Sequence, residues 1–276
     1  MTKASSEKYR LDYAKRVARL AGLREPRIER AFASVPREDF LPPPPWTTIS
    51  LGNATQTQEV ADLYDNVLVA IDRARGINNG EPALHAAWLD AVNLQPGETV
   101  IHVGAGTGYY TAILALLVGP GGHVEAYEYE PDLAAQATHN LEAYQQVTVQ
   151  AGSAFGRVLP NADVIYVNAG VPAPDVEWLR GLNPSGRLIF PWQPYKGWGP
   201  AILITRREAG FSATSLMNVG FISCSGAAVK AAGRHQPTET DIAAIRSVWL
   251  ADERPPDASA VAVYDGVWFS STGIGS

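Results

Sequence analysis

The segment Val100–Gly108, which reads VIHVGAGTG, constrains the fold of this chain more than any other. Its apolar start predicts a strand over Thr99–Val103, and the apolar run Tyr109–Val118 predicts a helix that ends at a glycine–proline run. Glycines between a strand and a helix allow a sharp turn and a close approach of the backbone to a ligand. The segment therefore predicts an α/β domain whose ligand site lies at this loop.

The rest of the chain continues the same alternation. Helices are predicted at 82–92, 131–144 and 175–182, and strands at 124–127, 147–150, 163–167, 187–191 and 201–206. Strands that alternate with helices predict right-handed βαβ units and a mostly parallel central sheet flanked by helices. Residues 7–34 predict two further helices, polar residues 47–60 predict loop, a turn is expected at 183–186, and 238–249 predict a helix.

These elements suggest three parts. Residues 1–80 form an N-terminal helical and loop region on the substrate side, 81–226 form the cofactor-binding core, and 227–276 form a C-terminal extension. Trp192, Tyr195 and Trp198 lie in an aromatic loop that is expected to close over a substrate, to pack on the surface, or to form a subunit contact as in a homodimer.

Composition excludes several classes of protein. The formal net charge of −6 disfavours nucleic acid and anionic membranes as partners, and no apolar run approaches the roughly 20 residues of a membrane span. The single cysteine, Cys224, cannot form an intramolecular disulfide. The polar N-terminus lacks a signal-peptide pattern, so a cytoplasmic location is expected. The histidines and acidic residues show no metal-ligand spacing, so no metal is expected.

Glu128 and Tyr109 indicate which cofactor the loop binds. Glu128 ends the next predicted strand, twenty residues after Gly108, where a carboxylate can accept both hydroxyls of a ribose. A dinucleotide fingerprint would require glycine at position 109, where this chain has tyrosine. A G-x-G-x-G loop without a basic residue suits a ligand that has no pyrophosphate. The pattern favours S-adenosylmethionine over NAD.

Several longer segments carry a resemblance to a known family. They are LREPRIERAFASVPREDFL (23–41), VIHVGAGTGYYTAILA (100–115), VEAYEYEPDLAAQATHNL (124–141), ADVIYVNAG (162–170) and WLRGLNPSGRLIFP (178–191). With Tyr64-Asp65 and Val67–Ile71 they resemble the protein-L-isoaspartate (D-aspartate) O-methyltransferases over about residues 20 to 226.

The resemblance implies a Rossmann-like methyltransferase fold. It also implies transfer of a methyl group from S-adenosylmethionine to a carboxylate of a protein or peptide, with S-adenosylhomocysteine as product. The glycine loop and the resemblance together assign the cofactor to His85, His102, Val103, Gly104, Ala105, Gly106, Gly108, Tyr109, Glu128, Tyr129, Ser153, Ala154 and Asn168. For His85, a core position on its helix is an equal alternative.

Departures from the family pattern concentrate at the site. The substrate loop, T-I-S-x-P in the family, is rebuilt as Asn78-Asn79-Gly80, so that the family's serine falls on Gly80. The substrate side is expected at Asn78, Asn79, Gly80 and Asn168, with asparagine amides replacing the lost hydroxyl. His102 stands where the family has an acidic residue, Ser153 where it has aspartate, and Asn168 where it has a small residue.

The chemistry leaves alternatives open. A carboxylate acceptor is ionised near pH 7 and needs no general base, so the enzyme's contribution is alignment and exclusion of water. The rebuilt loop also allows a methyltransferase that acts on a small molecule or another acceptor. Two further hypotheses are a non-catalytic S-adenosylmethionine-binding protein, which uses residues 227–276 for docking or dimerisation, and an NAD-dependent enzyme, which Tyr109 disfavours.

Overall fold

The computed structural model describes residues 3–194, 197–225, 227 and 237–275, so Tyr195 of the aromatic loop lies outside the described residues. The chain folds into two compact units, and each unit is built from three separate segments of the sequence. The first unit comprises Met1–Glu98, Ala105–Ala126 and Glu130–Ala151, and the second comprises Thr99–Gly104, Tyr127–Tyr129 and Gly152–Ser276. The glycine loop is divided between them, after Gly104. The three parts expected from the sequence stay a prediction.

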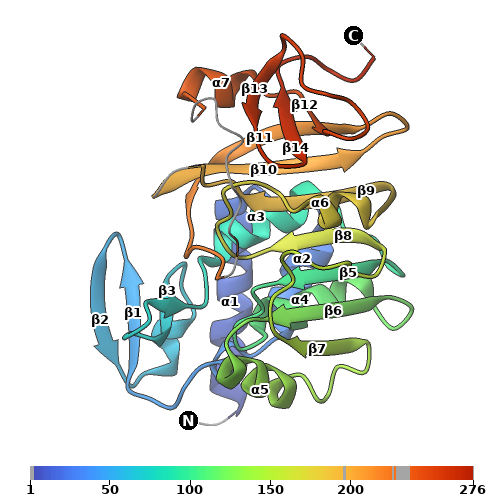
Figure 1. Cartoon of the computed structure of the whole chain (residues 1–276). Helices are drawn as coiled ribbons and strands as arrows, with labels where there is room; N and C mark the ends of the chain where they lie inside the picture. Colours follow the sequence, from blue (N-terminus) through green and yellow to red (C-terminus); the bar gives the residue numbers. More distant parts are fainter. Residues whose placement is uncertain (1–2, 195–196, 226, 228–236, 276) are drawn as a thin grey trace. The chain divides into compact units, whose positions relative to one another are not determined.

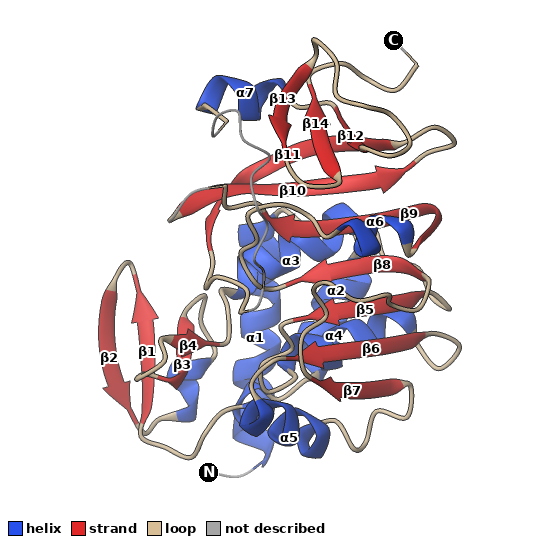
Figure 2. Ribbon diagram, viewed as in Figure 1, coloured by secondary structure: helices blue, strands red, loops and turns tan. Residues whose placement is uncertain are grey.

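The helices of the first unit confirm the expected helical elements. They are α1 (Lys3–Ala21), α2 (Pro26–Ser34), α3 (Pro82–Val92), α4 (Tyr109–Val118) and α5 (Pro131–Asn140), with the 3₁₀ turns η1 (Arg37–Phe40) and η2 (Val60–Leu63) (Figure 2). Tyr13, Phe32 and Tyr109 meet edge-to-face among the first four helices. Proline occupies the first turn of α2, α3 and α5, where its missing N–H removes no helical bond.

A small antiparallel sheet in the first unit corrects the loop predicted for residues 47–60. Its strands are β1 (Trp46–Ser50), β2 (Asn53–Thr57), β3 (Leu68–Asp72) and β4 (Ile77–Asn78), in the order β2-β1-β3-β4; Figure 1 labels the first three, and Figure 2 also labels β4. Leu51 and Gly52, both with positive φ, make the β1–β2 turn. The prediction was wrong because β2 is exposed on nearly all its residues and shows no alternation of apolar and polar side chains.

The second unit confirms the α/β class and carries a mixed sheet. The order is β13 (Ala260–Val263), β14 (Val267–Ser270), β12 (Ser247–Leu250), β11 (Phe211–Gly220), β10 (Trp198–Arg206), β9 (Leu182–Pro191), β8 (Ala162–Val167) and β5 (Thr99–Val103). β5, β8 and β9 are parallel, as expected, and the pairs from β9 outward are antiparallel. β6 (His123–Glu128) runs from the first unit into the second, and β7 (Val147–Ala151) lies beside it in the first.

Residues beyond the parallel strands differ from expectation. The turn predicted at 183–186 lies inside β9, where Ser185 has φ 63°. The helices α6 (Val176–Arg180) and α7 (Glu239–Ala244) are short, and the helix predicted through residue 249 instead gives way to β12. Ser247–Leu250 are all buried, and β12 pairs with both β11 and β14, so tertiary pairing decides this segment.

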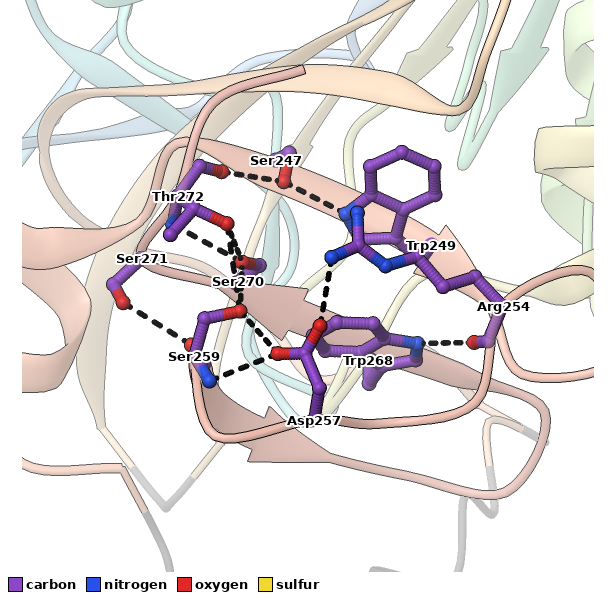
Figure 3. Close-up of polar contacts among 9 residues, drawn as sticks. All are labelled: Ser247, Trp249, Arg254, Asp257, Ser259, Trp268, Ser270, Ser271 and Thr272. Carbon is purple, nitrogen blue, oxygen red and sulfur yellow. Dashed lines mark hydrogen bonds and ion pairs between the residues drawn. The ribbon is translucent and has the colours of Figure 1, made fainter. Parts of the chain in front are cut away.

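The C-terminal strands β12, β13 and β14 form one end of the sheet, and a cluster of aromatic and polar side chains lies there (Figure 3). The Arg254 guanidinium lies 4.4 Å from the centroid of the Trp249 ring and 5.7 Å from that of Trp268, and it donates a 2.7 Å hydrogen bond to Asp257. Trp192 is buried and stacks on Phe269 with ring centroids 4.5 Å apart, whereas Trp198 is exposed. Trp192 therefore belongs to the core rather than to a surface loop.

Candidate functional site

The first group of site residues lies at the carboxyl ends of three strands of the second unit. β5 and β8 pair in parallel with Val103 opposite Val167. The Gly104 N–H donates to the Tyr127 carbonyl over 2.9 Å, and the Asn168 N–H donates to the Val103 carbonyl over 2.8 Å. Gly104, at φ 77°, thus stands between the end of β6 and the end of β8, and a Cβ there would meet the Asn168 backbone at 3.5 Å.

The β6 end places the predicted ribose carboxylate. Glu128 is buried, with 7% of its surface exposed, and its carbonyl accepts a 2.7 Å bond from the Gly152 N–H. Ser153 follows, and its hydroxyl accepts from the Phe155 N–H over 3.0 Å, so it stabilises its own turn. Ala154 is buried and its carbonyl accepts from a tryptophan N–H, while Tyr129 is exposed. A buried carboxylate at a strand end matches the geometry expected for binding ribose hydroxyls.

At the β8 end, two of the departures from the family pattern meet. The Asn168 Nδ2 donates to His102 Nε2 over 2.8 Å. His102 is fully buried on β5, and burial alone lowers its pKa to about 3, so the imidazole is neutral at pH 7. The Oδ1 of Asn168 is buried and has no hydrogen-bond partner in the part of the chain that the structure describes.

The helix side of the glycine loop lies in the first unit. Gly106 and Gly108 both have positive φ, and a Cβ at Gly108 would meet Leu141 at 2.8 Å, so glycine is required there. Ala105 is buried, and Gly108 caps α4. Tyr109 is buried in the helical core, its hydroxyl 3.2 Å from that of Tyr13. Burial raises the Tyr109 pKa well above its ordinary value. Its predicted contact with the cofactor stays a prediction.

The rebuilt substrate loop is fixed by a buried arginine. Asn79 is 7% exposed, and its Oδ1 accepts from the Val69 N–H at 2.9 Å and from the Arg37 guanidinium at 3.1 Å. Arg37 is fully buried and also donates to the carbonyls of Leu63, Asp65 and Val67. The Asn78 Oδ1 accepts from the Gly80 N–H over 3.0 Å. Both asparagine oxygens thus accept hydrogen bonds, Asn79 from outside the loop and Asn78 within it, while the buried Nδ2 of Asn79 has no partner among the described residues.

His85 explains why glycine occupies position 80. Gly80 has φ 74°, and a Cβ there would lie 2.4 Å from His85 Nε2 and 3.2 Å from the Tyr110 ring. His85 is buried and stacks on Tyr110, with ring centroids 3.8 Å apart. The Tyr110 hydroxyl donates to the Gly80 carbonyl at 3.3 Å. In this structure a side chain at position 80 would therefore clash with the His85 ring.

A segment that the sequence did not single out lies beside the β8 end. The Gly170 N–H donates to the Ile222 carbonyl, and the Cys224 N–H donates to the Gly170 carbonyl, each at 2.8 Å. Burial, followed by the negative charges of Glu128 and Asp175, raises the pKa of the Cys224 thiol to about 11. No local pattern marks this segment, because the antiparallel strand before it determines its position.

Two absences hold for residues 3–194, 197–225, 227 and 237–275. Among them we find no cluster of three or more metal-ligating side chains. Within the same residues, none of the helices is both long enough and apolar enough to cross a membrane.

Known proteins share this architecture. A model of the protein-L-isoaspartate(D-aspartate) O-methyltransferase family matches residues 15–228. The protein-L-isoaspartate O-methyltransferase of Ignicoccus hospitalis is 30% identical over 200 residues, which cover 71% of this chain and 87% of that protein.

Two solved structures are also similar. One is a protein-L-isoaspartate O-methyltransferase that aligns with a TM-score of 0.66 at 25% identity, over 78% of this chain and 66% of that chain. The other, a candidate protein-L-isoaspartate O-methyltransferase from Plasmodium falciparum in complex with S-adenosyl-L-homocysteine, aligns with a TM-score of 0.62 at 20% identity, over 78% and 97% of the two chains. The second likeness supports the fold alone.

The α/β fold, the glycine loop and these matches define an S-adenosylmethionine-dependent methyltransferase. Within that class, the chain belongs to the protein-L-isoaspartate(D-aspartate) O-methyltransferase family. The resemblance inferred from the sequence motifs is therefore confirmed, and so is the choice of cofactor over NAD. The individual site residues stay predictions.

Proposed function

We propose that this protein transfers a methyl group from S-adenosylmethionine to a carboxylate of a protein or peptide. One observation carries the assignment of the site. Three adjacent strand ends present a buried carboxylate at Glu128, a bare backbone at Gly104 and a carboxamide at Asn168. A carboxylate at one strand end, a glycine at the next and ligand binding at the carboxyl ends of the strands match what a nucleoside cofactor requires.

The residues present fit this cofactor. Glu128 would accept the ribose hydroxyls, and Gly104 leaves space that a side chain would fill. Gly106 and Gly108 would let the loop backbone approach the ligand. Ser153 and Ala154 follow Gly152 after β7, and the sequence assigns the adenine side of the site to them.

The chain's own residues would act by binding and alignment. When bound, S-adenosylmethionine supplies a methyl group that a positively charged sulfur has already activated. Transfer of that methyl group to an ionised carboxylate would cancel the two opposite charges and would require no proton movement. A general base is therefore unnecessary, and the protein contributes a fixed approach and a water-poor site.

The acceptor side of the proposal rests on the rebuilt loop. Arg37 holds Asn79 through its Oδ1, and the buried Nδ2 of Asn79 has no hydrogen-bond partner among the described residues, so this amide is the candidate donor to a carboxylate. Gly80 supplies no hydroxyl, and His85 lies in the corresponding space. The replacement of serine by glycine at this position favours a second candidate function. In it, the protein uses the same cofactor but methylates an acceptor other than isoaspartate, either another carboxylate or a different group.

Transfer of labelled methyl groups tests the proposal. We expect label to enter a peptide that contains isoaspartate and to be lost on mild alkaline treatment, because methyl esters hydrolyse. The matched control is the same peptide with ordinary aspartate. Equal and negligible labelling of both peptides would remove the isoaspartyl acceptor and leave the second candidate. Calorimetry with S-adenosylhomocysteine and NAD completes the test, since binding of NAD alone would contradict the methyltransferase assignment.

A further inference from the structure

The order of the strand ends gives the bound cofactor a direction. The chain leaves β8 at Asn168, β5 at Gly104 and β6 at Glu128, and backbone hydrogen bonds join Gly104 to Tyr127 and Asn168 to Val103. On the proposed function, the ribose is at Glu128 and the cofactor crosses the glycine loop. Its amino-acid end, which carries an ammonium group, then reaches toward Asn168.

The bond between Asn168 and His102 fixes the orientation of the asparagine side chain. An amide nitrogen can only donate, so His102 Nε2 must be the acceptor in the 2.8 Å contact with Asn168 Nδ2. A neutral imidazole has one acceptor nitrogen, and full burial of His102 favours the neutral form. Because Nδ2 donates to His102, Oδ1 is the atom of the Asn168 side chain that remains available to bind another group.

That oxygen has no hydrogen-bond partner in the part of the chain that the structure describes. Oδ1 of Asn168 is buried and unpaired within the described residues. Buried carbonyl oxygens are nearly always hydrogen-bonded in native proteins, so an exception at a ligand site points to the ligand. A carboxylate cannot fill the role, because two acceptors repel each other. The missing partner must be a donor.

We propose that Asn168 Oδ1, oriented by His102, accepts a hydrogen bond from an N–H group of the bound reactants. The two departures at positions 102 and 168 thus form one functional pair, in which His102 is a positioning residue. Two sources of the N–H group have the right chemistry. They are the ammonium group of S-adenosylmethionine and a backbone N–H of the peptide acceptor.

Calorimetry on the full chain distinguishes the sources. The probes are S-adenosylhomocysteine and 5′-methylthioadenosine, which lacks the amino-acid end. If the ammonium is the donor, Asn168→Leu weakens S-adenosylhomocysteine about 10- to 100-fold, the order expected for losing one bond to a charged group, and leaves 5′-methylthioadenosine unchanged. Asn168→Asp, which keeps an acceptor oxygen, restores the binding of S-adenosylhomocysteine. If the peptide is the donor, Asn168→Leu leaves both probes unchanged and raises KM for the peptide.

Other results would overturn the pairing. Equal weakening of both probes would mean that Asn168 only supports the fold of the loop, and no change in either probe or in the peptide KM would mean that Oδ1 contacts no reactant. Failure of the unaltered protein to bind S-adenosylhomocysteine would instead contradict the proposed function.

His102 has its own test. His102→Leu should weaken S-adenosylhomocysteine or the peptide in parallel with Asn168→Leu, and the double variant should be no weaker than the Asn168 variant alone. His102→Gln supplies an acceptor oxygen and should restore much of the loss. Additive effects of the two leucine substitutions would contradict a coupled pair. Urea unfolding of each variant, measured alongside, shows whether it is folded.

Discussion

Restoring the family's serine at position 80 should damage this protein rather than repair it. Gly80 has φ 74°, a left-handed conformation that costs a residue with a side chain about 1–2 kcal/mol. The new Cβ would also lie 2.4 Å from His85 Nε2, inside a buried stack with Tyr110. Overpacking of this kind typically costs about 1–3 kcal/mol. We expect Gly80→Ser to lower the free energy of unfolding by about 2–5 kcal/mol.

Urea denaturation measures this change, and the chain offers a matched control. Gly76 lies in the turn between β3 and β4, four residues before Gly80, at φ 69°, and a Cβ added there would meet nothing within 4 Å. Gly76→Ser should therefore show the conformational cost alone, about 1–2 kcal/mol. The penalty of Gly80→Ser should shrink when it is introduced into a His85→Ala background. If Gly80→Ser and Gly76→Ser destabilise equally, the steric argument is refuted, and the loss of the serine needs another explanation.

Three further outcomes follow from burial and charge. The depressed pKa of His102 means that its contribution to stability is present above pH 6.5 and is lost toward pH 3. Between these pH values the free energy of unfolding should fall by up to about 1.4 kcal/mol for each pH unit that the pH drops. In urea denaturation at pH 7 and pH 5, His102→Gln should abolish this pH dependence, whereas the control His139→Gln, at an exposed position, should keep it. The raised pKa of Cys224 leaves little thiolate at pH 8, so iodoacetamide should react with it at least about 100-fold more slowly than with the urea-unfolded chain; equal rates would contradict this. Phe269→Ala should cost about 3–5 kcal/mol in urea denaturation, because it removes a fully buried ring stacked on Trp192; a loss below about 1 kcal/mol would contradict the stacking.

Local signals predicted the centre of the fold well. The predicted bounds of Pro82–Val92, Thr99–Val103 and Tyr109–Val118 coincide with α3, β5 and α4. Each of these elements has an uninterrupted apolar run, with proline, glycine or a polar turn at its ends. The antiparallel strands were missed for the opposite reason. β2 is exposed and β12 depends on partners distant in sequence, so neither carries a local pattern strong enough to identify it.

The site divides in the same way. Sequence reasoning identified His102 and Asn168 as departures from the family pattern, but not that they bond to each other. That contact depends on the register of β5 against β8, which places Val103 opposite Val167 and so brings Asn168, the first residue after β8, beside His102. Likewise, the sequence showed that glycine replaces the serine at position 80, but not that a side chain there would clash with the His85 ring. The sequence shows which residues differ from the family pattern, but only the structure shows that His102 and Asn168 contact each other.

The strands that follow β11 limit where the chain can be truncated. The family model ends at residue 228, yet β12 pairs with β11 and Phe269 covers Trp192. A fragment cut at the family boundary would present an open strand edge beside uncovered aromatic side chains, the usual starting point for aggregation. We therefore expect a fragment that ends at residue 228 to aggregate more readily than the whole chain.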